Sequence, residues 1–96
     1  MRRDEALRRL AEHRDELTAM GAASLSLFGS VARDEAGPDS DVDVLIELSR
    51  PMGLFGLAAI QLRLEEILDR RVELLTANGI AERYRRHITP DLVRAT

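Results

Sequence analysis

Two aspartates stand one residue apart at the entrance to an apolar run in the middle of the chain. The run Val42–Leu48 alternates apolar and polar side chains, which predicts a β-strand. Because alternate residues of a strand share a face, Asp41 and Asp43 point the same way, about 6.5 Å apart. Like charges at that separation repel each other, and a bridging divalent cation would reverse the repulsion. The pair therefore predicts a magnesium site, since Mg²⁺ is usually held by few carboxylates and completed by substrate phosphates.

A glycine and a serine precede the aspartates and follow the segment Ser24–Phe28, whose alternation predicts another strand. Gly29 leaves the backbone bare where a ligand must come close. Ser30 is the expected N-cap of a short helix over Val31–Glu35, and a helix N-terminus favours anions. This turn predicts a site for a triphosphate. Arg33, one turn along, either contacts a phosphate or base, or pairs with one of the nearby acids.

A third carboxylate is normally wanted to help hold the catalytic metal and to take a proton from the attacking hydroxyl. Two metal ions held in this way stabilise both the attacking and the leaving oxygen of an in-line displacement. Glu73 is the acid inside a further predicted strand, Arg71–Leu75, and is the preferred candidate. The alternative for Glu73 is a half-exposed strand residue without a role. Glu47 shares the face of the aspartates but lies further from the phosphate turn.

Composition limits the classes of function that need to be considered. The 96 residues suit one domain, spanning 1–96, and the 14 basic and 17 acidic residues leave a net charge of −3. That charge, with few aromatic residues, argues against direct binding of nucleic acid. The absence of cysteine predicts a cytoplasmic protein, and the apolar run Gly53–Ile60 is too short to span a membrane.

The remaining pattern supplies the elements that must position these side chains. A first helix is expected from an N-cap at Asp4 to Gly21, and a second from about Leu54 to Asp69, apolar on more than one side. A short helix over 80–87 and a weak apolar segment, Leu92–Ala95, complete the chain. Alternating helices and short strands predict an α/β (α+β) domain with a small mixed sheet of three or four strands, covered by helices mainly on one face.

The segment Phe28-Gly29-Ser30-Val31-Ala32-Arg33, followed by Ser40-Asp41-Val42-Asp43-Val44-Leu45-Ile46, resembles the signature of the minimal nucleotidyltransferase family, in the polymerase-beta-like superfamily. The resemblance runs from the first helix to about residue 87 and implies the nucleotidyltransferase fold. The resemblance implies that Gly29 and Ser30 bind the triphosphate and that Asp41 and Asp43 bind Mg²⁺. Arg33 and Ser40 are further expected nucleotide contacts, and Glu73 is the expected third ligand of two Mg²⁺ ions. Where these small proteins usually carry Asp as the third carboxylate, position 73 is Glu.

Many proteins of this kind resemble antitoxins encoded beside a HEPN-type ribonuclease toxin. The resemblance implies transfer of AMP from ATP to a tyrosine hydroxyl of the toxin, which silences it. An alternative is a weak or inactive enzyme that neutralises its partner by occlusion. Transfer to a small molecule is disfavoured because there is no second domain to form a pocket. A basic cluster at 83–87 is either a solvated helix end or a docking site for an acidic partner or an RNA.

Overall fold

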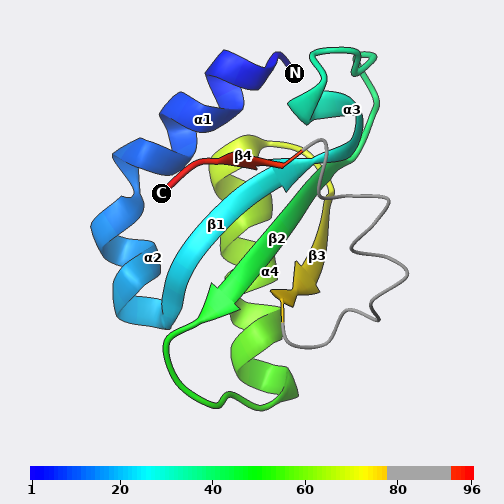
Figure 1. The fold of residues 1–96 in the computed structure, drawn as a ribbon. Helices are drawn as coiled ribbons and strands as arrows, with labels where there is room; N and C mark the ends of the chain where they lie inside the picture. Colours follow the sequence, from blue (N-terminus) through cyan, green and yellow to red (C-terminus); the bar gives the residue numbers. More distant parts are fainter. Residues whose placement is uncertain (78–91) are drawn as a thin grey trace.

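The computed structural model describes residues 1–77 and 92–96, which form helices and strands in alternation (Figure 1). The predicted helix over 80–87 and the basic cluster at 83–87 lie outside the described residues. None of the helices in the described part of the chain is long and apolar enough to cross a membrane. In chain order the elements are α1 (Arg3–Glu12), α2 (Arg14–Met20), β1 (Ala22–Phe28), α3 (Gly29–Ala32), β2 (Val42–Leu48), α4 (Leu54–Leu68), β3 (Val72–Thr76) and β4 (Val93–Arg94).

The strands form one mixed sheet in the order β3-β2-β1-β4. β1 runs antiparallel to both β2 and β4, whereas β2 and β3 are parallel and joined through α4. The end of β1 therefore meets the beginnings of β2 and β3 at a single edge of the sheet, next to α3 (Figure 1). This architecture confirms the predicted mixed α/β fold with a small sheet.

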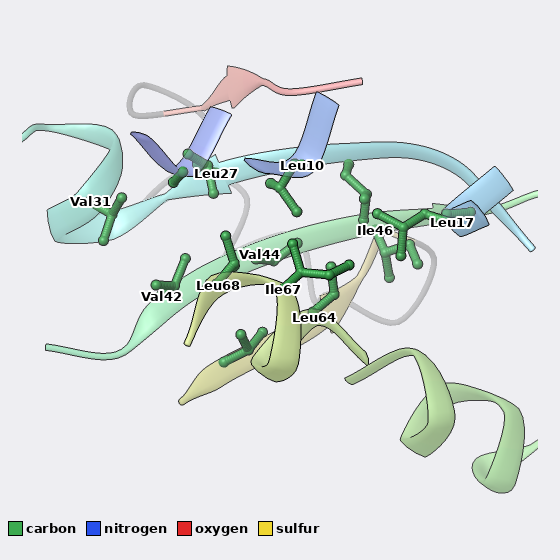
Figure 2. Packing of buried hydrophobic residues seen from close by; sticks show 14 of the residues in the cluster. Leu10, Leu17, Leu27, Val31, Val42, Val44, Ile46, Leu64, Ile67 and Leu68 are labelled. Atoms are coloured by element: carbon green, nitrogen blue, oxygen red, sulfur yellow. The ribbon is translucent and has the colours of Figure 1, made fainter. Parts of the chain in front are cut away.

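One face of the sheet forms the core together with the helices. Leu25 and Leu27 of β1 pair in register with Ile46 and Val44 of β2, so the alternation of both strands turns these side chains to the same side. Figure 2 shows Leu27, Val44 and Ile46 packed beside side chains from the helices, among them Leu10, Leu17 and Leu64. The fully buried members from the helices are Ala6, Leu10, Leu17, Val31, Ile60, Leu64 and Leu68.

Several predicted boundaries are confirmed to within two residues. β2 covers the predicted strand Val42–Leu48 without a shift, and α4 begins at the predicted Leu54. β1 is two residues longer at its start than predicted, and β3 is displaced by one residue from Arg71–Leu75. The weak apolar segment near the end of the chain contains the short strand β4, which pairs with β1.

The prediction of one continuous first helix capped by Asp4 is wrong in two respects. The helix begins at Arg3, not after Asp4. The main-chain N–H of Arg3 donates to Oδ1 of Asp34, in the loop after α3, at 3.0 Å. That cap comes from a residue far along the chain, and no local pattern encodes it. The helix is also interrupted at His13, whose Nδ1 lies 2.9 Å from the carbonyl oxygen of Arg9. Both halves still contribute to the core, through Ala6 and Leu10 of α1 and Leu17 of α2.

Helix α4 has one face that packs and one that does not. Its buried residues contact the sheet, α1 and α2, and Arg9 of α1 donates to the carbonyl oxygens of Ile67 and Leu68, which end the helix. These are carbonyls for which a helix end lacks its own partners. In contrast, Leu54 is 80% exposed and Phe55 is 91% exposed. The expectation that α4 is apolar on more than one side is confirmed.

The two faces of α4 predict opposite effects of one substitution. Leu64 is fully buried, so Leu64→Ala should lower the free energy of unfolding by about 2–5 kcal/mol through lost burial and a residual cavity. Leu62, which is 61% exposed on the same helix, is the matched control, and Leu62→Ala should change stability by no more than about 0.5 kcal/mol. Urea unfolding followed by circular dichroism measures both. Equal losses would contradict the assigned orientation of α4.

Candidate active site

Three side chains form a row across the solvent-facing side of the sheet, at the edge where the strands meet. Phe28 at the end of β1 pairs in register with Asp43 of β2, and Asp43 pairs with Glu73 of β3. The core-facing neighbours Val42 and Val72 show that the row points away from the core, because successive strand residues alternate between faces. The parallel pairing thus brings Glu73 beside Asp43, at the position predicted for a third carboxylate.

The carboxyl groups of Asp43 and Glu73 are close enough to share a hydrogen bond. Asp43 is half-buried. This burial, followed by the hydrogen bond and charge of Glu73 and by the charge of Asp41, raises the pKa of Asp43 to about 6, with Arg33 opposing the shift. Burial and nearby acids both disfavour the charged form of Asp43, and a cation bound at this edge would offset that cost. The metal site stays a prediction.

Glu47, the other acid considered for the third position, does not belong to this row. It pairs with Ser24 near the opposite end of β1, and its side chain is exposed. The same face of β2 that carries the two aspartates carries Glu47, as predicted, but the strand takes it away from the phosphate turn. Glu73 is therefore the carboxylate that the fold brings to the aspartate pair.

Gly29 allows the Asp43 carboxylate to reach this position. Its φ angle of 70° lies in the left-handed region, where a side chain is unfavourable. A Cβ atom at this position would overlap Asp43 Oδ2 and lie 3.1 Å from Asp43 Cγ. The sequence suggested that the bare backbone admits a ligand. In the structure, the space that a side chain would fill is occupied by the carboxylate itself.

The turn after Gly29 differs in detail from the prediction. Ser30 is not the N-cap, because α3 begins at Gly29 and Ser30 lies inside the helix. The first turn of α3 is closed by the Arg33 N–H, which donates to the Gly29 carbonyl oxygen at 3.1 Å. Ser30 is half-buried in that turn, and its carbonyl accepts the N–H of Glu35 at 2.8 Å. The helix also ends at Ala32, short of the predicted Glu35.

Arg33 and Ser40 have local partners as well as predicted ligand roles. Arg33 Nε donates to Glu35 Oε2 at 3.2 Å, which is the ion pair weighed as its alternative role, and its charge also acts on Asp43. The Ser40 hydroxyl accepts the N–H of Gly37 at 3.0 Å and so closes the loop that leads into Asp41. A nucleotide contact by either side chain stays a prediction.

Helix α4 holds β3, and with it Glu73, in place. Among the described residues β3 is the last strand of the sheet on its side, so part of its backbone has no strand partner there. Gln61 Nε2 donates to the carbonyl oxygen of Val72, and the N–H of Val72 donates to Glu65 Oε2, both at 3.0 Å. Two polar side chains of the helix therefore satisfy the residue that directly precedes Glu73.

The donor set suits a hard divalent cation that is shared with a substrate. All three carboxylates lie near the start of β2 and β3, and burial, followed by the neighbouring acids, raises the pKa of Asp43. Within residues 1–77 and 92–96, no three acidic, histidine or cysteine side chains are arranged so that they could hold a metal ion by themselves. A Mg²⁺ ion at Asp41, Asp43 and Glu73 therefore stays a prediction, and it would need further oxygens from water and phosphates.

Two arginines beside the acids were not singled out by sequence reasoning. Residues 38–41 and 69–71 line a recess of about 450 Å³, in which Asp41 faces Arg70 and Arg71. The signal available in the sequence was their position, directly before the strand that carries Glu73. Nothing in that position distinguishes a site residue from an ordinary surface arginine, because the recess exists only once β2 and β3 are paired.

The structure predicts different costs for two glycine substitutions in this region. Gly29→Ala should lower the free energy of unfolding by about 1–3 kcal/mol, because of its backbone conformation and the overlap with Asp43. A Cβ on Gly37 would meet only Ser40 Oγ, at 3.7 Å, so Gly37→Ala should cost no more than about 0.5 kcal/mol. Urea unfolding at neutral pH compares the two. A loss at Gly37 as large as that at Gly29 would refute the proposed close approach.

The raised pKa of Asp43 predicts a pH-dependent gain in stability for Asp43→Asn. Between the ordinary value of 3.8 and about 6, the folded state binds more protons than the unfolded state, so Asp43 lowers wild-type stability as the pH rises through this window. The variant should match the wild type near pH 4 and exceed it above pH 6, by on the order of 1 kcal/mol after allowing for solvent screening.

Urea unfolding in EDTA, from pH 4 to pH 8, measures this difference. Asp39→Asn is the control, since Asp39 is exposed in the loop before the site. A constant offset between Asp43→Asn and wild type across the whole pH range would show that the Asp43 carboxyl is not under electrostatic stress.

The chain matches known proteins over most of its length. The nucleotidyltransferase domain family matches residues 7–94. The candidate protein adenylyltransferase MJ0126 of Methanocaldococcus jannaschii is 35% identical over 86 residues, which cover 88% of each chain. The protein adenylyltransferase MntA of Thermococcus cleftensis is 33% identical over 72 residues, covering 74% of this chain and 73% of MntA.

The fold is also shared with solved structures. One of them contains the tri-AMPylated HEPN toxin of Shewanella oneidensis in complex with the MNT antitoxin. Its matching chain superimposes on this chain with a TM-score of 0.70 at 12% identity, and the match covers 98% of this chain and 71% of the other. At that identity the likeness concerns the fold alone. The family match and the M. jannaschii relative establish the family, and they confirm the resemblance seen in the motif. The chain belongs to the nucleotidyltransferase domain family.

Proposed function

We propose that this chain is a Mg²⁺-dependent protein adenylyltransferase that acts as an antitoxin. It transfers AMP from ATP to a tyrosine hydroxyl of a HEPN-type ribonuclease toxin encoded beside it. The observation that carries the proposal is the Asp43–Glu73 carboxylate pair, packed directly against the Gly29 turn. Relatives that are protein adenylyltransferases by name support the reaction class, and the structure of an MNT antitoxin with an AMPylated HEPN toxin supports the partner.

The reaction divides the site into two sides. The turn at Gly29 and Ser30 receives the triphosphate, with Arg33 beside it. The acceptor oxygen forms a bond to the α-phosphorus, the bond between that phosphorus and the bridging oxygen breaks, and pyrophosphate leaves. The proton of the acceptor hydroxyl passes to a carboxylate, and Glu73 is the candidate because it is exposed at the edge strand.

Asp41, Asp43 and Glu73 are the residues that would hold Mg²⁺. When bound, the ion supplies positive charge between the carboxylates and the phosphate oxygens. The chain's own part is to keep these carboxylates at one edge of a rigid sheet, so that little reorganisation is needed when substrate arrives. The extra methylene of Glu73, relative to Asp, gives its carboxyl group the reach to hydrogen-bond with Asp43.

A binding module that silences its partner by occlusion is the second candidate. The observation in its favour is the apolar surface that α4 exposes at Leu54 and Phe55. Large apolar side chains exposed next to each other are typical of interaction sites. Such a protein would keep the fold and the interface without needing the carboxylates.

The first test is the intact mass of the toxin encoded by the adjacent gene, co-expressed with this chain. The mass should rise by whole AMP units with the wild type, and should not rise with the double variant Asp41→Asn/Asp43→Asn, because the metal ligands are removed. Asp15→Asn, at an exposed acid of α2, is the control and should leave the modification intact.

The same experiment separates the two candidates. Protection from toxicity should be lost with the double variant if chemistry silences the partner. An unmodified toxin in a stable, protective complex with both wild type and double variant would replace the enzyme by the occluding module.

A further inference from the structure

The recess lined by residues 38–41 and 69–71 lies on one side of the aspartate pair, and the phosphate turn lies on the other. β1, which leads into Gly29, and β3, which follows Arg71, flank β2 on opposite sides. The N–H of Val42 donates to the carbonyl oxygen of Arg71 at 2.8 Å, so Asp41 and Arg71 stand side by side where the two parallel strands begin. The acids therefore lie between the turn and the recess.

An in-line displacement needs the nucleophile and the leaving group on opposite sides of the phosphorus atom. With the triphosphate on the turn, pyrophosphate leaves towards β1, and the acceptor must approach from the β3 side. The recess lies on that side and has Asp41 in its wall.

The charges in the recess leave one cation without a partner. Asp69 Oδ2 lies 4.0 Å from Arg70 Nη1, Asp41 is assigned to the metal, and Asp39 is exposed to solvent. Among residues 1–77 and 92–96, Arg71 forms no ion pair, and its side chain is exposed. Its guanidinium presents donors in a fork that matches a carboxylate.

Arg70 adds a second unsatisfied donor. Its Nη1 donates to the carbonyl oxygen of Asp69 at 2.7 Å, but its Nε is buried and has no hydrogen-bond partner in the described part of the chain. Buried donors are nearly always paired in folded proteins, so this Nε is an exception in a residue that lines the recess.

We propose that this recess receives the acceptor segment, and that Arg71 pairs with a carboxylate next to the tyrosine that is modified. The inference rests on the proposed function and extends it to the acceptor, which is then an acidic peptide segment. Arg71 is a substrate-binding residue in this assignment, and the carboxylates keep their roles.

The test compares two synthetic peptides, each with a single tyrosine, flanked by glutamates in one and by glutamines in the other. The wild-type chain should show a KM about tenfold lower for the acidic peptide, as expected for one charge-assisted pair. Arg71→Gln should abolish this preference and leave the KM for ATP unchanged, whereas Arg71→Lys should retain part of it. Arg14→Gln, an exposed arginine on α2, is the charge-matched control and should keep the full preference.

Binding is measured in parallel by fluorescence anisotropy of the same peptides, with Mg²⁺ and a non-hydrolysable ATP analogue. Preferential binding of the acidic peptide that depends on Arg71, without AMP transfer, would uphold the recess and reject the proposed function. Equal binding of both peptides to the wild type would overturn the inference, and so would an Arg71→Gln effect on the KM for ATP instead of the peptide.

Discussion

The close approach of the Asp43 carboxyl to Gly29 on one side and to Glu73 on the other is the constraint on which the rest of the structure depends. It requires a glycine with a positive φ angle at the end of β1, a parallel partner strand for β2, and an acid at one register position of that partner. If any of these is missing, the carboxylates no longer meet. The site is therefore a property of three strand ends held together, and no single segment contains it.

The repulsion at this edge opposes folding, and the core has to outweigh it. β2 carries both contributions, because its aspartates face solvent while Val42, Val44 and Ile46 are fully buried on the other face. Each such burial contributes about 1.5–3 kcal/mol, compared with on the order of 1 kcal/mol for the screened repulsion at Asp43. The apolar face of one strand thus exceeds the cost that its polar face imposes, which allows a stressed site on a small domain.

Helix α4 connects this core to the chemistry. Its buried face packs on the sheet, while Gln61 and Glu65 hold the residue before Glu73, and Arg9 of α1 binds its last carbonyl groups. The helix ends in a left-handed residue, Asp69, which turns the chain into the two arginines of the recess. Two parallel strands need a crossover connection, and here that connection is α4. The same helix therefore also positions the third carboxylate and the wall of the recess.

The sequence alone determined the strand β2, the helix α4 and the shared face of Asp41 and Asp43, because alternation and helical periodicity are local properties. It also determined the family, since the Gly-Ser turn and the aspartate pair lie within one short segment. The tertiary structure decided what depends on pairing between distant segments. Strand pairing places Glu73 beside Asp43, and the Asp34 side chain caps α1 from a distant loop. Helix α3 also begins at Gly29, where the sequence predicted a cap at Ser30. Such contacts follow from strand register and packing, which no local pattern of side chains specifies.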